Sequence, residues 1–156
     1  MSTPRRLVIC VTTALCLVVT PTAGALTMGS FRTPSGNIVC AYAAGPNPSF
    51  GPRWHPSVLC GIKSGLRPPS PRKTCREGGR VSDRIYLSAV GRAAVSSCAG
   101  DPGPFVGQER ARVLGYGKVW VDRFSGLRCV SKISGLTCRN KSGHGFFLSR
   151  QRSRVF

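Results

Sequence analysis

Apolar residues after the first 25 positions come in short runs that glycine and proline interrupt every few residues. No run keeps a 3.6-residue apolar period over three helical turns, so the pattern favours short strands over helices. It predicts an all-β or β-dominated fold of short strands and hairpins, in which the alanine-rich segment Gly91–Cys98 is also compatible with a short helix. The predicted strands are Asn37–Tyr42, Ser57–Ile62, Arg84–Val90, Lys118–Val121, Leu127–Ser131, Gly135–Arg139 and Phe146–Ser149.

Three segments rich in proline and glycine separate these strands: Gly45–Pro56, Gly65–Pro71 and Gly100–Gly107. Proline lacks an amide donor and fixes φ, which excludes all three segments from inner strands. We therefore predict that they are loops. None is long enough to separate two domains, so the chain is expected to form one domain.

The first 25 residues have the parts of an export signal in the correct order. Arg5 and Arg6 carry positive charge, Leu7–Thr20 is uncharged and mostly apolar, and Ala23-Gly24-Ala25 provides small residues for cleavage. The apolar run is shorter than the roughly 20 residues that a membrane-spanning helix needs. We predict that residues 1–25 are a signal peptide. Residues 26–156 then form a single domain that is secreted to the extracellular space or cell envelope, without an integral membrane anchor.

Six cysteines remain in the predicted mature chain, and an even number in an exported protein is typical of a disulfide framework. They contain no Cys-x-x-Cys pair, which argues against a metal site. The six are Cys40, Cys60, Cys75, Cys98, Cys129 and Cys138.

The spacing of these cysteines favours one of the 15 pairings that six cysteines allow. Cys129 and Cys138 flank the turn Lys132–Gly135, so a hairpin would place them opposite each other. By the same reasoning Cys40 and Cys60 would join two strands across a proline-rich loop. This arrangement leaves Cys75 to pair with Cys98.

The charge balance points to anionic partners but does not identify one. Without Arg5 and Arg6, 21 of the 23 basic residues remain against five acidic ones, so the mature net charge is +16. Such an excess attracts polyanions such as wall polymers or nucleic acid. The cations are mostly arginine and are scattered along the chain, a pattern that a GC-rich genome also produces without selection for binding. Each of the few acidic residues is expected to pair with a nearby arginine.

Several motifs resemble a domain family of unknown function found in secreted proteins of high-GC Gram-positive bacteria. The opening motif is Phe31-x-x-Pro-Ser-Gly-Asn-Ile-x-Cys40, and the later ones are Leu114-Gly-Tyr-Gly117, Gly135-Leu-Thr-Cys-x-Asn140 and Gly143-His-Gly-Phe-Phe-Leu-Ser-Arg150. The resemblance covers nearly all of residues 26–156. It implies a small exported, cysteine-bridged domain, and it implies no activity, cofactor or catalytic residue.

No motif in the sequence is typical of a known enzymatic reaction, and we assign no catalytic residue, metal ligand or cofactor. Two histidines could in principle supply an acid and a base for RNA cleavage. Nothing in the sequence brings His55 and His144 together, however. The position of His144 between two glycines favours a structural turn.

Aromatic residues are the remaining candidates for ligand contact, because they stack on bases and sugars. Trp54 lies in a proline-rich loop beside Arg53 and His55 and is expected to be exposed. Trp54 and His144 are therefore the speculative binding residues. Core packing is expected for most of the others, which are Tyr86, Tyr116, Trp120, Phe124, Phe146 and Phe147.

The leading hypothesis is a monomeric, non-catalytic extracellular or cell-envelope binding module for an anionic or polysaccharide partner. One alternative is a small secreted hydrolase that acts on RNA or glycans. Another is a basic antimicrobial protein, which is disfavoured because no amphipathic basic helix is visible.

Overall fold

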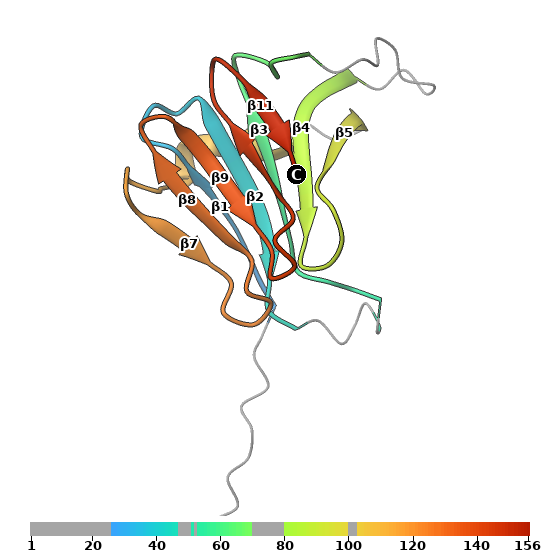
Figure 1. The fold of residues 1–156 in the computed structure, drawn as a ribbon. Helices are drawn as coiled ribbons and strands as arrows, with labels where there is room; N and C mark the ends of the chain where they lie inside the picture. Colours follow the sequence, from blue (N-terminus) through green and yellow to red (C-terminus); the bar gives the residue numbers. More distant parts are fainter. Residues whose placement is uncertain (1–25, 47–50, 52, 70–79, 100–102) are drawn as a thin grey trace, which may run out of the picture.

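Two β-sheets pack face to face around one hydrophobic core in the computed structural model of the chain (Figure 1). The structure describes residues 26–46, 51, 53–69, 80–99 and 103–156, and the predicted signal peptide lies outside them. The strand order is β5-β4-β3-β2-β1-β6 in the six-stranded sheet and β11-β10-β9-β8-β7 in the five-stranded sheet. Within the described ranges all neighbouring strands are antiparallel except β1 and β6, which are parallel.

The two sheets divide the chain into an N-terminal and a C-terminal half, with β6 crossing back to β1. The six-stranded sheet contains β1 (Thr27–Arg32), β2 (Ile38–Ala44), β3 (Ser57–Ile62), β4 (Arg80–Ser88), β5 (Ala94–Ala99) and β6 (Arg112–Val113). The five-stranded sheet contains β7 (Val119–Val121), β8 (Arg128–Lys132), β9 (Gly135–Arg139), β10 (Gly145–Leu148) and β11 (Ser153–Val155). Two short 3₁₀ helices, η2 (Gly103–Phe105) and η3 (Gln108–Arg110), precede β6.

The predicted β-dominated fold is confirmed, and each of the seven predicted strands corresponds to a strand of the structure. The short helix considered for Gly91–Cys98 is wrong. Residues 94–99 instead form β5, which pairs with β4 through Ile85↔Val95 and Tyr86↔Ala94. The backbone hydrogen bonds offered by β4 outweigh the modest helix preference of alanine, because propensity is weak next to tertiary context.

The predicted loops contain no strand where the structure describes them, but the third is not wholly irregular. Residues 103–105 form η2, whose Pro104 is buried. The ring of Phe105 covers Gly61 on β3, where an added Cβ would lie only 2.5 Å from the ring. The Phe105 ring from η2 therefore fills the space that a side chain at position 61 would occupy.

Among the described residues each sheet contains one disulfide, and both bonds point into the core. Cys40 faces Cys60 across β2 and β3, and Cys129 faces Cys138 across β8 and β9, with a Cα–Cα distance of 4.0 Å in both cases. All four cysteines are fully buried. Both predicted pairings are confirmed, and each joins neighbouring strands within a sheet. The predicted Cys75–Cys98 bond lies outside the described residues.

Aromatic residues divide between the core and the surface. Phe146 is fully buried, and the rings of Phe31, Tyr42 and Trp120 form a cluster with centroid distances of 4.7 to 6.3 Å. The expected core packing is wrong for three others, because Tyr86, Tyr116 and Phe124 are 40%, 43% and 59% exposed.

The buried acid Asp122 is a second correction, because it stabilises a turn instead of pairing with an arginine. Its carboxylate accepts hydrogen bonds from the amides of Phe124 (3.1 Å) and Ser125 (3.2 Å) and from the Ser125 hydroxyl. The side chain thereby satisfies the backbone donors of the β7–β8 turn, as aspartate commonly does.

Candidate functional site

Three hairpin turns and the loop before β7 gather at one end of the sandwich, at the upper left of Figure 1. The turns are β1–β2 (residues 33–37), β8–β9 (residues 132–135) and β10–β11 (residues 149–152). Together with Tyr116 they enclose an open cleft of about 280 Å³. Its lining residues are Thr33, Ser35, Asn37, Ile38, Tyr116, Lys132, Ile133, Ser134, Gly135, Ser149, Arg150 and Gln151.

The β1–β2 turn forms one wall and is held by hydrogen bonds to its own backbone and to the residues that follow β3. The amide of Gly36, whose φ of +67° suits glycine, donates to the Thr33 carbonyl at 2.8 Å. The Asn37 side chain donates to the Ser64 hydroxyl (3.1 Å) and accepts from the Ser64 amide (3.2 Å). The wall is therefore anchored to the residues that follow β3.

The opposite wall comes from the five-stranded sheet and is equally well fixed. In the β10–β11 turn the Ser149 hydroxyl accepts from the Gln151 and Arg152 amides (3.3 and 3.1 Å) and donates to the Arg152 carbonyl. The loop that carries Tyr116 is bound to β8 by the Gly117 amide, which donates to the Ser131 carbonyl at 2.7 Å. The polar groups of the cleft thus stand on turns whose backbones are hydrogen-bonded.

The lining of the cleft is polar and carries positive charge. Lys132 and Arg150 are exposed cations, and the half-exposed ring of Tyr116 offers an aromatic surface. Hydroxyl and amide groups supply hydrogen bonds in both directions. Among the described residues that line the cleft there is no histidine, aspartate, glutamate or cysteine.

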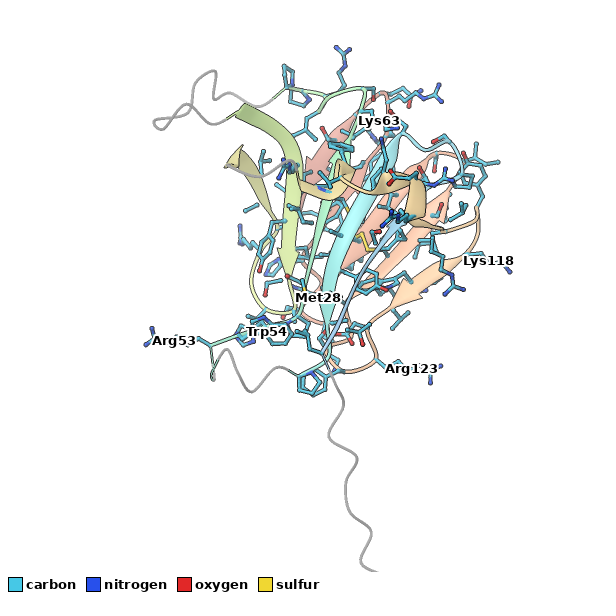
Figure 2. The ribbon with its side chains drawn as sticks, turned by 180° about the vertical axis from the view of Figure 1, so that it is seen from behind. Met28, Arg53, Trp54, Lys63, Lys118 and Arg123 are labelled. Carbon is cyan, nitrogen blue, oxygen red and sulfur yellow. A yellow bond between two sulfur atoms is a disulfide. The ribbon has the colours of Figure 1, made fainter. Side chains whose placement is uncertain are left out.

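The two residues proposed from sequence, Trp54 and His144, lie away from this cleft. Figure 2 shows Trp54 at the end of the domain opposite Lys63, whose amide donates to the carbonyl of Asn37 in the cleft wall (2.9 Å). Trp54 is partly buried, so its expected exposure is wrong. A tryptophan ring buries a large apolar area when any surface is near, which favours packing over exposure.

His144 occupies the β9–β10 turn, as the flanking glycines predict. Its carbonyl accepts from the Asn140 amide at 2.9 Å, and the Asn140 side chain donates to the Ser88 and Gly91 carbonyls. His55 lies at the same end of the domain, next to Pro56, whose carbonyl accepts from Ala89. No hydrogen bond joins the two imidazoles in the part of the chain that the structure describes.

Sequence reasoning missed the cleft because its members are polar residues in separate turns. One signal was present, since the motifs that carry the family resemblance supply Ser35, Asn37, Tyr116, Gly135 and Arg150. The structure brings these motifs together from both halves of the chain. Their proximity depends on the sheet order, which no local pattern shows.

The protein is a small β-sandwich domain with a buried disulfide in each sheet. The chain belongs to a family of unknown function (DUF6636), whose model matches residues 11–156. No curated protein and no solved structure matches the chain significantly.

Two further features concern the described residues only. No helix among them has the length and hydropathy needed to cross a bilayer. They also contain no group of three or more histidine, cysteine, aspartate or glutamate side chains that could hold a metal ion.

Proposed function

We propose that this protein is a non-catalytic binding module of the extracellular space or cell envelope, whose cleft binds one unit of an anionic saccharide. The observation that carries the proposal is the composition of the cleft. Two cations, an aromatic ring and several hydroxyl and amide groups converge there from four separate segments. Binding sites commonly use a few convergent polar groups of this kind on turns that a rigid scaffold holds in place.

The charged and aromatic groups of the cleft suit such a ligand. Lys132 and Arg150 would neutralise a phosphate or carboxylate group, and arginine in particular donates two parallel hydrogen bonds to it. The ring of Tyr116 would pack against the apolar face of a sugar. A volume of about 280 Å³ is close to the small end of known ligand pockets, so a single sugar unit fits better than a longer piece.

The same lining supports binding rather than hydrolysis. General acid–base catalysis needs titratable groups beside the ligand, such as a pair of carboxylates for a glycoside. The described lining supplies tyrosine, lysine, arginine, hydroxyls and amides instead. Recognition of an anion requires nothing more.

Secretion is part of the proposal and rests on the signal-like N-terminus and on the two disulfides. Disulfides persist in oxidising compartments and are rare in the cytosol. The intact mass of the exported protein should correspond to a chain that begins at Leu26 or within a few residues of it, with its cysteines oxidised. A full-length chain retained in the membrane fraction would contradict this.

Calorimetric titration of the mature, oxidised protein with short phosphorylated and uronic saccharides tests the cleft. Tyr116→Ala should weaken binding about tenfold, equivalent to about 1.4 kcal/mol. Tyr86→Ala is the matched control, because Tyr86 is similarly exposed (40% against 43%) but lies on the six-stranded sheet. Trp54→Ala tests the opposite end of the domain and should leave affinity unchanged. Equal losses in Tyr116→Ala and either other variant would refute the assignment.

The hydrolase alternative is tested in the same samples. Product formation from RNA or from the saccharide by the wild type, lost in His144→Ala, would replace the binding module with an enzyme. We expect the ligand to be recovered intact.

A further inference from the structure

The outward face of the five-stranded sheet collects basic residues and has no acid among the described ones. Residues of this face alternate along each strand with the buried residues of the core, such as Cys129 and Cys138. The two acids whose side chains the structure describes lie elsewhere, Glu109 in η3 and Asp122 buried in the β7–β8 turn. Five exposed cations stand on the face or at its border: Arg128, Lys132, Arg139, Arg152 and Arg154.

The strand register places two of these cations directly against each other. Arg128 on β8 is the cross-strand partner of Arg139 on β9. Like charges in this position destabilise a sheet. Neither guanidinium has an ion pair with a described acidic side chain, so no described residue compensates the repulsion. A bound anion between the two strands would compensate it.

Aromatic rings hold the neighbouring guanidinium groups in place. Arg139 and Arg154 lie over the ring of Phe156, at 4.8 and 5.3 Å from its centre, and Arg152 lies over the ring of Phe147 at 5.3 Å. A stacked guanidinium loses less freedom when it binds an anion, because its plane is already oriented. Its N–H edges remain available as donors. The guanidinium groups also occupy the space over the rings in which a nucleobase would stack.

The cations follow the rows of the sheet. One row runs Val121, Arg128, Arg139 and Gly145 across β7 to β10, and Phe156 continues it through its backbone hydrogen bonds to Gly145. Neighbouring strands are about 4.8 Å apart, so these cations form a series at intervals of one or two strand spacings. Lys132 stands at the end of β8 and also lines the cleft, which makes face and cleft continuous.

We propose that this face binds a linear polyanionic glycan, with phosphate or carboxylate groups along the chain, that runs across β8, β9, β10 and β11 and reaches the cleft at Lys132. The inference rests on the proposed function, since the unit bound in the cleft would belong to this chain. Repeated charges on one side of the sheet complement repeated anions on the ligand. Because the rings are covered by guanidinium groups, a polymer without bases is favoured over nucleic acid.

Binding of two polymers to the mature, oxidised protein tests the proposal. Poly(glycerol phosphate) carries phosphates and polygalacturonate carries carboxylates, so the pair separates the two sources of negative charge. Arg128→Gln/Arg139→Gln should reduce affinity for at least one polymer by 10-fold or more at about 100 mM salt. Its log–log salt dependence should become less steep by about two released counterions. Affinity for the monomeric unit should stay unchanged.

The control variant Arg92→Gln/Arg110→Gln removes the same charge from exposed positions outside this face. It should change polymer affinity by less than threefold. Equal losses in both double variants would mean that net charge alone attracts the polymer, and the proposal would fail. Circular dichroism should show the same folded spectrum for all variants, because every substituted residue is exposed.

Two outcomes separate this inference from the proposed function. If Tyr116→Ala weakens binding of both monomer and polymer while the face variant matches the wild type, the cleft stands and the face is refuted. If the face variant alone loses polymer binding and no monomer binds, the cleft proposal fails. Binding of oligo(dT) as tight as that of either glycan would overturn the choice of a glycan.

Discussion

The outward faces of the two sheets differ, although their inward faces supply the same core. Across the six-stranded sheet the middle row consists of Ser30, Ala41, Leu59, Tyr86 and Ala94, all uncharged. The middle row of the five-stranded sheet consists of Val119, Val130, Thr137, Phe147 and Arg154, and the row at its end places the exposed Arg128 opposite Arg139. The matching end row of the six-stranded sheet also holds two arginines, Arg32 and Arg84, but they are not on adjacent strands and neither is exposed. Figure 2 shows Lys118 and Arg123 projecting at the two ends of β7, so the basic surface continues around the edge of this sheet.

This difference shows which residues of each sheet are determined by the stability of the fold. Burial of apolar surface determines the inward residues of both sheets, at about 25 cal/mol per Å². The outward face of the six-stranded sheet is partly covered by η2, which favours small residues such as Gly61. The outward face of the five-stranded sheet is exposed and gains nothing from adjacent arginines. The binding that we propose for this face would account for its composition.

The largest effects should come from the disulfides, which are present in both sheets. The chain-entropy model assigns about 3.3 kcal/mol to the 20-residue separation of Cys40–Cys60 and about 2.6 kcal/mol to the 9-residue separation of Cys129–Cys138. Urea unfolding of each Cys→Ala double variant should therefore show a greater loss for the six-stranded sheet. A greater loss for Cys129→Ala/Cys138→Ala would show that local packing in the five-stranded sheet outweighs loop length.

The next largest difference in stability between the two sheets should come from glycine substitutions. A Cβ at Gly145 on β10 would collide with the Cys138 carbonyl oxygen of β9, whereas one at Gly61 would meet the Phe105 ring of η2. A side chain can move aside and a paired backbone cannot. Overpacking commonly costs about 1 to 3 kcal/mol, so we expect Gly145→Ala near the upper limit and Gly61→Ala near the lower one. Thermal unfolding by calorimetry measures both, and equal shifts would contradict this reasoning.

Removal of the Asp122 carboxylate from the β7–β8 turn should lower the free energy of unfolding by about 1 kcal/mol, a typical value for the loss of a side-chain cap. Asp122→Ala deletes a carboxylate that satisfies two amides and a hydroxyl. Asp122→Asn keeps one acceptor oxygen for the Phe124 amide but replaces the oxygen that accepts from Ser125 with a donor, so it should recover only part of the loss in chemical denaturation. Full recovery by the asparagine variant would contradict a role for the two hydrogen bonds from Ser125.

The smallest effect should be a gain in stability on the basic face. Arg128→Gln removes the like-charge pair with Arg139 and leaves the Arg139–Phe156 stack intact. We expect the free energy of unfolding to rise by about 0.3 kcal/mol at low salt, with the gain vanishing at high salt as charges are screened. Arg110→Gln in η3 is the control and should show no gain. A loss of stability in Arg128→Gln would mean that this side chain contributes packing.

Local features of the sequence were sufficient to predict seven of the described strands and both described disulfides. Residues that alternate between core and surface in an antiparallel hairpin also place Cys129 opposite Cys138, and the same parity applies to Cys40 and Cys60. The helix considered for Gly91–Cys98 was wrong because β5 is stabilised by pairing with β4, a contact that the local sequence does not show. The strands β1, β6 and β11 were not predicted, since few of their residues are buried and the alternation is weak. Of these, β6 and β11 are short edge strands, whereas β1 lies between β2 and β6.

Only the tertiary structure decided where the groups of the proposed binding surface come together. The cleft joins turns from residue 33 to residue 151, and its assembly depends on which sheet edges and ends come together. The basic face depends on register, because a shift of one residue would move every arginine of a strand to the other side. Arginines that look scattered along the sequence fall into rows for this reason. Charge and polarity are readable from the sequence, but their convergence on one surface is a property of strand order and packing.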